Sequence, residues 1–514
     1  DTAALAALRL AEGTLARKPR RRPALTRFLE TAPGRPIVFR KARAGVMDRT
    51  RGLYPAPLAI LECVETGYAR GMKAGLDKES IEFGQLAAGP QAKNLIRLFE
   101  AMNELKKPTA DVAPRPVHHL AVLGGGFMGS GIAAVSIPRV TTVVKDISDD
   151  VLARCARSID EGLRKRMRSG AISKFERDVQ WTRLILTTDA RELANADLVI
   201  EAVFEDLDLK RKILAETESL ISASTVFASN TSALPISSIA GNASHPERVL
   251  GMHYFSPVPK MPLLEIIVTE TTAPWALATA RAFGIQQGKT VIVVKDGPGF
   301  YTSRILSPFL SEAVFLLQEG ARVHEIDRAI RDFGYPVGPL TLLDEVGIDV
   351  AAHVTDEFGQ IFAGRGLAAP DAFPRMRDAG LLGRKTNKGF YLYGGKRGKK
   401  GRPVNENVYR FFGDAPRRTL PPGEIADRLA LLMINEAAYC LQEGIIAAPR
   451  DGDVGAILGL GFPPFRGGPF RYVDAMGAAG IVGTMKRLRD RLEAPRFEPA
   501  PLLRDQARVG ATFY

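Results

Sequence analysis

A glycine-rich turn near residue 124 places the strongest constraint on how this chain folds. The apolar run from Leu120 to Leu123 predicts a buried β-strand, and Gly124, Gly126 and Gly129 follow it at G-x-G-x-x-G spacing. The first glycine allows a tight turn, the second lets the backbone approach a pyrophosphate, and the third lets a helix pack close to the strand. Because the N-terminus of that helix offers free N–H groups, the segment predicts a dinucleotide site.

An acidic residue supports the same interpretation over a chance cluster of glycines. A second strand, Thr141 to Val144, leads to Asp146, which stands 22 residues after Gly124 and is placed to accept hydrogen bonds from an adenosine ribose. The carboxylate favours NAD over NADP because it would repel a 2′-phosphate, although Lys145 beside it weakens that preference. The other loop side chains expected at this site are Phe127 and Met128.

The composition is that of an ordinary globular protein, since 46% of the 514 residues are apolar and 25% are charged. A chain of this length divides into about three or four domains. It contains no run of about 18 apolar residues, so no membrane span is expected. The formal charge of +13 would attract a phosphate-rich cofactor or acyl carrier, and no nucleic-acid-binding motif accompanies it.

The three cysteines, Cys63, Cys155 and Cys440, are widely separated and lack metal-ligand spacing. This usage is typical of a reducing compartment, and we expect a cytoplasmic protein without a metal site. The sequence starts at Asp1 with no signal peptide ahead of it, so we interpret it as part of a longer chain.

Residues 1–112 are expected to form a helical extension. Apolar residues recur at helical spacing from Leu58 to Leu105, and no active-site motif accompanies them. The basic run Arg17–Arg22 is interpreted as a solvated loop, with an interaction tail as the alternative. The proline-rich segment Lys107–Arg115 is expected to link this region to the next domain.

Residues 113–296 are expected to form a doubly wound, mainly parallel α/β sheet of the Rossmann type. A charged helical region extends to about Arg183, and strands alternate with helical segments after it. Ligands then bind at the carboxyl ends of the strands. The strands expected in this part are Asp197–Val203, Val226–Leu234, Glu265–Val268 and Thr290–Val294.

After Asp296 helical patterns replace strand patterns, and an internal repeat appears. The segment Glu312–Gly320, EAVFLLQEG, returns 124 residues later as Glu436–Gly444, EAAYCLQEG, and each copy is followed by a Gly-aromatic-Pro step. Such self-similarity predicts a duplicated all-helical domain. We expect the first copy at 297–395, a basic linker at 396–419 that includes Lys396–Arg402, and the second copy at 420–514.

His253 and Glu265 form the most informative pair of side chains. They lie 12 residues apart in HYFSPVPKMPLLE. A carboxylate on one imidazole nitrogen fixes the tautomer and favours the protonated form, which suits a base that removes a hydroxyl proton. A histidine in a loop is more often structural, but this one follows a strand end that carries the polar residues Asn230, Thr231 and Ser232.

Several longer motifs together resemble the L-3-hydroxyacyl-CoA dehydrogenase family. They are GGGFMGSGIA, DLVIEAVFED, FASNTSALPI, GMHYFSPVPKMPLLEII, DGPGFYTSRIL and GRKTNKGFYLYG. Their order, the duplicated helical domain and the helical extension are similar to the multifunctional alpha subunit of fatty acid β-oxidation, across essentially the whole chain. The resemblance implies NAD-dependent oxidation of a (3S)-hydroxyacyl-CoA to a 3-ketoacyl-CoA.

The resemblance also implies roles for individual residues. His253 would be the catalytic base, Glu265 the residue that orients it, and Ser232 a contact to the substrate hydroxyl. Ser303 stands in GFYTSR where many members have an active-site asparagine in GFYVNR, a change that we interpret as tolerated. The positions that match the cofactor side are Glu205, Lys210, Asn230, Ser232, Ser256 and Lys385.

Other departures from the family pattern concern ligand binding. Gly162 and Ser169 stand where monofunctional relatives hold CoA with serine and lysine, and Ser256 stands where they have asparagine. Pro138 ends the glycine-loop helix early, and the segment before Asp146 is one residue short, which we expect to lower cofactor affinity. The basic side chains nearby that could contact CoA are Arg164, Lys165, Arg166 and Arg168.

In the multifunctional family a hydratase/isomerase domain precedes the region that matches residues 1–112. Its paired glutamates and oxyanion hole are not visible in this sequence, so we expect dehydrogenase activity without hydration of enoyl-CoA, whereas a full-length parent would also hydrate. The resemblance further implies an acyl-CoA substrate, a thiolase beta subunit as partner, and a homodimer or hetero-oligomer. The alternatives are an NAD-binding scaffold of weakened activity that docks thiolase, and a dehydrogenase for another hydroxy acid on the same fold.

Overall fold

The computed structural model describes residues 2–14, 23–107, 112–352, 361–362, 364–367, 371–394 and 402–514. The chain divides into two units, residues 1–93 and residues 94–514. The predicted loop Arg17–Arg22, most of Lys396–Arg402 and residues 108–111 of the predicted linker lie outside the described residues. Among the helices of the described ranges, none is long and apolar enough to cross a membrane.

The first unit is helical in its described residues, as predicted. Its helices α4 and α5 pack closely where two glycines face each other, because a Cβ at Gly75 would lie 2.9 Å from the Cα atom of Gly67. The helices are α1 (Thr2–Ala11), α2 (Ala24–Leu29), α3 (Arg35–Thr50), α4 (Ala56–Arg70) and α5 (Met72–Ala88), and α6 (Pro90–Glu104) continues into the second unit.

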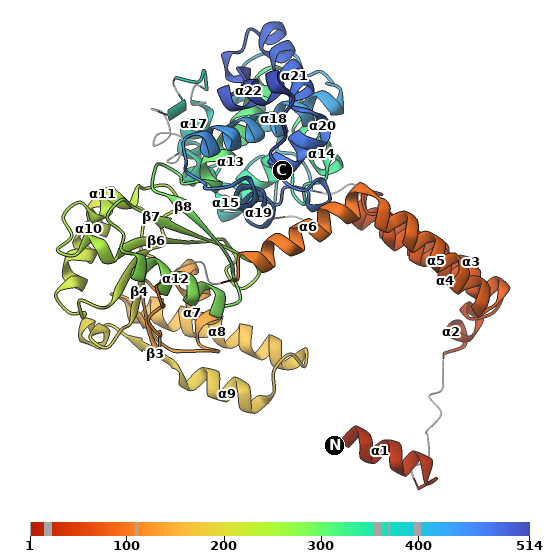
Figure 1. The fold of residues 1–514 in the computed structure, drawn as a ribbon, viewed down its shortest axis with the longest axis horizontal. Coiled ribbons are helices and arrows are strands. Elements are labelled where there is room, and N and C mark those ends of the chain that lie inside the picture. The colour runs from red at the N-terminus through yellow and green to blue at the C-terminus, as the bar shows by residue number, and fades with distance from the viewer. Residues whose placement is uncertain are drawn as a thin grey trace. The chain divides into compact units, whose positions relative to one another are not determined.

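The second unit begins with an eight-stranded sheet in the order β3-β2-β1-β4-β5-β6-β7-β8 (Figure 1). Neighbouring strands are parallel except β6 and β7, which are antiparallel, so the predicted mainly parallel, doubly wound sheet is confirmed. The strands are β1 (His119–Leu123), β2 (Thr141–Lys145), β3 (Leu184–Thr187), β4 (Leu198–Glu201), β5 (Val226–Ser229), β6 (Val249–Tyr254), β7 (Leu263–Val268) and β8 (Thr290–Lys295).

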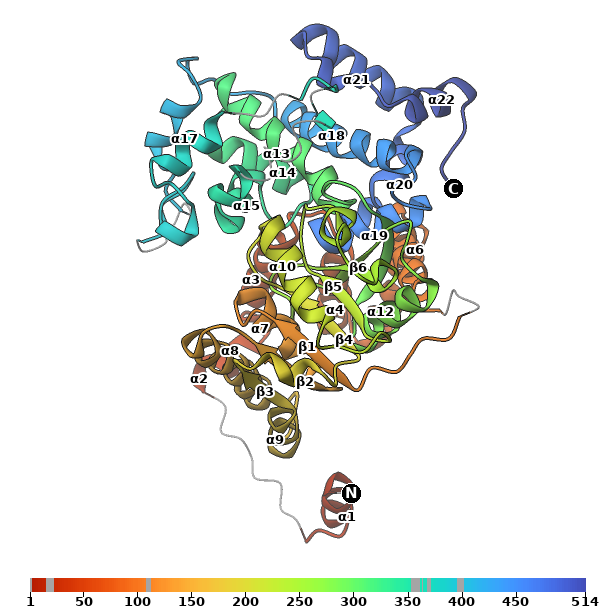
Figure 2. The same cartoon turned by 90° about the vertical axis from the view of Figure 1, so that its left-hand side faces the viewer.

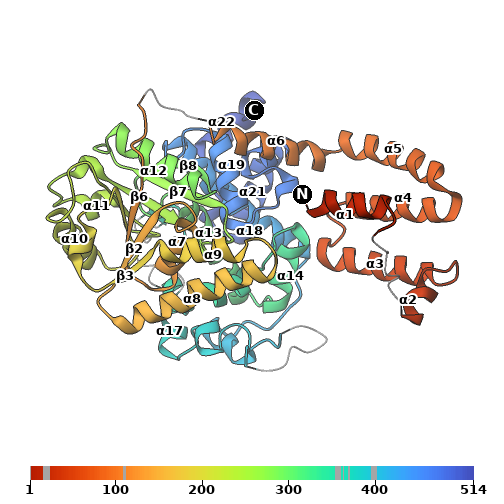
Figure 3. The same cartoon turned by 90° about the horizontal axis from the view of Figure 1, so that it is seen from below.

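Helices cover both faces of the sheet, so both faces are buried. Successive side chains of a strand point to opposite faces and therefore enter different cores. In β1, Leu120 and Val122 pack in a core with helices α7, α8 and α12, whereas Ala121 and Leu123 face α10, α11 and the helical domain. Helices α8 and α9 lie side by side (Figure 3). The helices are α7 (Phe127–Ser136), α8 (Asp149–Arg168), α9 (Lys174–Thr182), α10 (Leu207–Glu218), α11 (Ile236–Ala240) and α12 (Pro274–Gln286).

His253 lies within β6, so the loop expected there from the sequence is wrong. All six residues of β6 are buried, so its sequence shows no alternation of polar and apolar residues, and Gly251 interrupts the apolar run. The sequence analysis also misses β3, which has only four residues and pairs with β2 at the edge of the sheet.

The rest of the second unit is helical, as predicted, and contains two structurally similar copies. In each copy one buried aspartate caps the helix that follows a Gly-Pro step and accepts a tyrosine hydroxyl. Asp327 accepts from Leu340 N and the Tyr391 hydroxyl, both at 2.9 Å, and Asp453 accepts from Phe470 N and the Tyr514 hydroxyl, both at 2.8 Å. The same polar cluster in both copies agrees with the predicted duplication.

Helix α13 of the first copy packs against α18 of the second (Figure 2). The described helices of the first copy are α13 (Thr302–Gln318), α14 (Val323–Phe333), α15 (Pro339–Val346) and α17 (Ala372–Asp378). Those of the second are α18 (Pro422–Gln442), α19 (Pro449–Leu460), α20 (Pro469–Met476), α21 (Ala478–Leu492) and α22 (Pro501–Val509). Short 3₁₀ helices lie at Ala190–Leu193, Pro246–Arg248, Arg384–Thr386, Glu406–Phe411, Pro464–Arg466 and Pro495–Phe497.

Two buried arginines join the copies reciprocally, because each bonds the glutamates of the opposite copy. Arg304 donates to Glu436 at 2.7 Å and to Glu443 at 2.6 Å, and Arg428 donates to Glu312 and Glu319, each at 2.6 Å. The side chains of Arg428 and Glu312 are both 0% exposed. A buried charge that loses its partner is strongly destabilising, so these pairs bind the two copies to each other.

Replacement of Arg428 by Met should therefore lower the free energy of unfolding by about 3–5 kcal/mol, because Glu319 loses its short contacts and Glu312 keeps only Arg496. The temperature of thermal unfolding measures this loss. Arg508→Met is the matched control, since Arg508 is 75% exposed and 3.8 Å from Asp505. Equal unfolding temperatures for the two variants would contradict a structural role for the buried pair.

Candidate active site

A cavity of about 580 Å³ lies at the carboxyl ends of the parallel strands. Five of the residues predicted to bind a cofactor line it: Gly124, Gly126, Phe127, Met128 and Asp146. Its walls are mostly apolar, as is usual for a site that accepts a flat ring between a few polar groups. The glycine loop and the residues that follow β2 therefore meet at one cavity.

Each of the three glycines in the loop is required for a different structural reason. Gly124 has φ +100°, and a Cβ there would lie 2.7 Å from the carbonyl oxygen of Ala202. A Cβ at Gly129 would lie 1.8 Å from the carbonyl oxygen of Gly124, so α7 packs on the strand only without a side chain at this position. A Cβ at Gly126 would meet open space, which leaves the backbone there accessible to a ligand.

Asp146 directly follows β2 and lies beside the glycine loop. Its Oδ2 atom accepts a hydrogen bond from Gly125 N at 2.7 Å, and Oδ1 accepts one from Ser148 N at 3.2 Å. The carboxylate therefore shapes the loop as well as lining the cavity.

A buried ion network connects β4 with α10. Lys210 Nζ donates to both carboxylate oxygens of Glu201, at 2.8 and 3.1 Å, and lies 3.2 Å from Glu205 Oε2. Glu201 is 0% exposed and also accepts from Ser229 Oγ at 2.6 Å. Glu201 was not predicted from the sequence. An acid that ends the buried run DLVIE, nine residues before Lys210, is the pattern that could have indicated this ion pair.

Glu205 carries this network to the loop after β5. Its carboxylate accepts from the hydroxyl of Thr231 and, at 2.9 Å, from Ser232 N. Burial alone would raise the pKa of Glu205, but Lys210 and these donors bring it below its ordinary value, so the group stays ionised. Asn230 Oδ1 accepts from Tyr254 N at 2.9 Å, which ties the same loop to β6.

His253 and Glu265 face each other across the one antiparallel pair of strands in this sheet. Nδ1 of His253 lies 2.7 Å from Oε2 of Glu265, with the two residues 5% and 0% exposed. The rings of Phe255 and Phe300 lie 4.5 and 6.1 Å from the imidazole, measured between centroids. The imidazole is therefore held between aromatic side chains with one nitrogen bonded to a carboxylate.

Glu265 has a further partner that the sequence analysis misses. Thr302, at the start of α13, donates its N–H to Oε1 at 3.0 Å and its hydroxyl to Oε2 at 2.6 Å. Ser303, the next residue, was the one predicted from the sequence to belong to the site. In the described residues the hydroxyl that bonds Glu265 is that of Thr302. The unusual Thr-Ser step in GFYTSR is the signal that marks this place.

Seven of the twelve predicted cofactor residues do not line the cavity: Gly129, Glu205, Lys210, Asn230, Ser232, Ser256 and Lys385. Lys385 belongs to the first helical copy, where Nζ bonds both carboxylate oxygens of Asp349 at 2.9 Å. Ser256 lies in the connection between β6 and β7. Lys289 holds that connection through Nζ, which donates to the carbonyls of Val258 and Met261 at 2.5 and 2.8 Å, and burial lowers the pKa of Lys289 to about 8.

A basic hollow of about 500 Å³ lies between α8 and α9. Of the predicted CoA contacts, Arg164 and Arg168 line it, whereas Arg166 bonds Gln180 at 3.4 Å. Lys174, Arg177 and one acid, Asp178, complete the charged lining, and Arg164 and Arg177 also bond Asp160. Such a concentration of cations suits phosphate groups.

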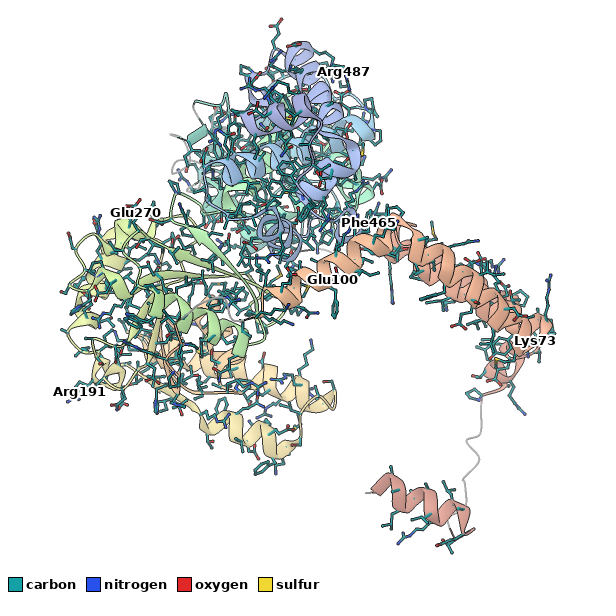
Figure 4. The ribbon with its side chains drawn as sticks, in the orientation of Figure 1. Lys73, Glu100, Arg191, Glu270, Phe465 and Arg487 are labelled. Atoms are coloured by element: carbon teal, nitrogen blue, oxygen red, sulfur yellow. The ribbon has the colours of Figure 1, made fainter. Side chains whose placement is uncertain are left out.

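A hydrogen bond joins α6 to the second helical copy. Nδ2 of Asn94, in the first half of α6, donates to the carbonyl oxygen of Phe465 at 2.9 Å, and Phe465 is labelled in Figure 4. Arg115 then lies 3.7 Å from the ring of Trp275 and donates to the carbonyl of Ser224 at 3.1 Å, which sets the path of the chain into β1.

Known protein families match the sheet domain and the two helical copies separately. Residues 119–297 match the family model "3-hydroxyacyl-CoA dehydrogenase, NAD binding domain", and residues 299–393 and 423–512 each match "3-hydroxyacyl-CoA dehydrogenase, C-terminal domain". The chain is 48% identical, over 98% of its length and 71% of the relative, to the fatty acid oxidation complex subunit alpha of Shewanella amazonensis.

Two solved structures are similar as well. The 3-hydroxybutyryl-CoA dehydrogenase of Escherichia coli is 27% identical with a TM-score of 0.68, covering 77% of this chain and 99% of its own. The (S)-3-hydroxybutyryl-CoA dehydrogenase of Ralstonia eutropha is 34% identical with a TM-score of 0.52, covering 55% of this chain and 100% of its own. The second helical match agrees with the duplication expected from the sequence.

Replacement of Gly129 by Ala should strongly weaken NAD binding, because the new Cβ forces α7 away from the carbonyl of Gly124 and moves the loop that faces the cavity. Quenching of protein fluorescence on titration with NADH measures the affinity, and we expect a loss of about 100-fold or more. Gly84→Ala, where a Cβ meets open space, is the matched control. Unchanged affinity in Gly129→Ala would contradict this account of the loop.

Proposed function

This chain belongs to the 3-hydroxyacyl-CoA dehydrogenase family and is an NAD-dependent enzyme, and from that premise we propose that His253 is the base of the reaction. The single observation that carries the proposal is the 2.7 Å contact between His253 Nδ1 and Glu265 Oε2. With Nδ1 donating to the carboxylate, Nε2 keeps its lone pair and can accept a proton. Glu265 is then a positioning residue that holds the ring.

The residues present fit NAD as the bound group. Open space beside Gly126 lets a pyrophosphate approach the backbone, and the carboxylate of Asp146 lines the same cavity. That carboxylate would repel a 2′-phosphate, which supports NAD over NADP. We propose that Glu205, Lys210 and Asn230 belong to the cofactor side, while Ser256 and Lys385 stay predictions from the sequence.

The proposed reaction oxidises the 3-hydroxyl carbon of a (3S)-hydroxyacyl-CoA. The hydroxyl proton passes to Nε2 of His253, the C3–H bond breaks with its electron pair, and C3 becomes the carbonyl of a 3-ketoacyl-CoA. When bound, NAD supplies the acceptor of the hydride. Ser232 and Ser303 are proposed to contact the substrate oxygen, and the burial of His253 and Glu265 keeps water from competing for the proton.

We propose that the phosphates of CoA bind in the basic hollow between α8 and α9. Its cationic lining, Arg164, Arg168, Lys174 and Arg177, supports this location. Phosphate groups form short, charge-assisted hydrogen bonds with arginine. Gly162 and Ser169, which stand at the family's usual CoA positions, offer no cation of their own.

We further propose that the substrates are intermediates of fatty acid β-oxidation and that the chain associates with a thiolase beta subunit. The relative from Shewanella amazonensis, named as the alpha subunit of a fatty acid oxidation complex, supports both points. The three free cysteines support a reducing compartment, for which we propose the cytoplasm.

Replacement of His253 by Ala should lower kcat/KM for 3-hydroxyacyl-CoA oxidation by a factor of about 100 or more, because no other group replaces the base. Formation of NADH, followed by absorbance, measures the rate. His324→Ala, at an exposed position of α14, is the matched control and should keep the rate of the unaltered chain. A rate for His253→Ala within about fivefold of the control would exclude His253 as the base.

A further inference from the structure

Thr302 supplies two hydrogen bonds to the Glu265 carboxylate, which also contacts His253. Its N–H binds one carboxylate oxygen and its hydroxyl binds the other, which is the same oxygen that contacts His253. We propose that Thr302 is a positioning residue that aims Glu265 at His253, and that α19 of the second helical copy holds Thr302 in place. This inference rests on the proposed role of His253.

The environment makes the hydroxyl important. Glu265 and Thr302 are both 0% exposed, so no bulk water can replace a lost donor. Hydrogen bonds to a carboxylate are short and strong, and they strengthen when water is excluded. Because Thr302 binds both oxygens, rotation of the carboxylate away from the imidazole would break both bonds at once. The orientation of Glu265 therefore depends on where Thr302 lies.

Thr302 is anchored through the residue before it. Tyr301 is 0% exposed, and its hydroxyl donates to the carbonyl oxygen of Gly452 in α19 at 3.0 Å. On the other side, Gly299 N donates to the carbonyl of Ala233 at 3.0 Å, which joins this turn to the loop after β5. The start of α13 is thus fixed between the sheet and the second helical copy.

Helix α19 approaches the site closely because one of its faces consists of glycines. Gly452, Gly455 and Gly459 recur at the spacing of one helix face. A Cβ at Gly455 would lie 2.9 Å from Ile292 and 3.1 Å from the ring of Tyr301. A Cβ at Gly459 would lie 3.3 Å from the ring of Phe255, the side chain that packs on the imidazole of His253. The second copy therefore supports both members of the pair.

The first test replaces Thr302 by Val, which keeps the shape of the side chain and removes the hydroxyl. With one of its two bonds lost, the Glu265 carboxylate can turn from the imidazole and supports the protonated ring less, so kcat should fall and the acid limb of the kcat/KM profile should move to lower pH by about one unit. Oxidation needs the neutral ring, and the activity that remains is then kept to a lower pH than in the unaltered chain. Thr302→Ser, which keeps the hydroxyl, should restore the original profile.

Tyr301, Asp453 and Cys440 are the titratable groups beside the pair that bear on this test, because Asp453 and Cys440 act on Tyr301. Burial raises the pKa of Asp453 to about 8 and that of Cys440 well above its ordinary value, so Thr302→Ser, which keeps both groups, is the reference for the profile. His253 is the partner itself, and burial keeps the pKa of Tyr301 well above its ordinary value, so the phenol stays neutral through the assay range. Thr142→Val is the matched control, because Thr142 is a buried threonine near the start of β2. Its hydroxyl donates only a 3.4 Å hydrogen bond to the carbonyl of Val140. Its profile should not move.

An acid limb that stays in place or moves to higher pH in Thr302→Val overturns the role of Thr302. The outcome differs from failure of the proposed base, because His253→Ala would then still lose its activity. If His253→Ala keeps its activity, the proposed function fails first and the inference fails with it.

The second test replaces Gly455 by Ala, which favours the helix by itself but pushes Tyr301 and with it Thr302. We expect kcat to fall about tenfold or more while NADH affinity is unchanged. Gly480→Ala in α21, where a Cβ meets open space, should leave kcat unchanged. If Gly455→Ala does not fold, as judged by circular dichroism, Tyr301→Phe removes only the bond to Gly452 and should lower kcat in the same way. Unchanged kcat in the folded variant overturns the role of α19.

Discussion

The antiparallel pairing of β6 with β7 is the constraint on which the site depends. A parallel pair needs a crossover connection of about a dozen residues or more, usually a helix, so two residues only 12 apart face each other on neighbouring strands because the chain reverses direction. Register then decides the contact, because a slip of one residue would move Glu265 to the other face. Lys289 stabilises the reversal by bonding two carbonyls of the connection.

The sheet, the glycine loop and the duplicated helical domain could be predicted from the sequence because each has a local pattern. A strand followed by G-x-G-x-x-G, an apolar run, and a repeated nine-residue segment are visible without knowledge of contacts. His253 and Glu265 could be paired for the same reason, since they lie in one short segment. Strand β6 could not be recognised, because a strand buried on both faces loses its alternation.

The residues that the sequence did not reveal reach the site across long separations. Thr302 lies 37 residues from Glu265, and Tyr301 bonds Gly452 across 151 residues. The reciprocal pairs Arg304 with Glu436 and Arg428 with Glu312 cross 132 and 116 residues. Nothing in composition or periodicity encodes which buried arginine meets which glutamate, because each copy contains the same residue types at the same spacing.

Two buried carboxylates in the sheet, Glu201 at the end of β4 and Glu265 within β7, have different partners. Glu201 is bonded by Lys210, and this ion pair leads through Glu205 to the backbone of Ser232, so it fixes the loop that borders the site. Glu265 is bonded instead by an imidazole, the side chain whose unperturbed pKa lies near neutrality. Equal burial of the two acids thus serves two arrangements, because a lysine ties the first to the loop at Ser232 and the imidazole of His253 contacts the second.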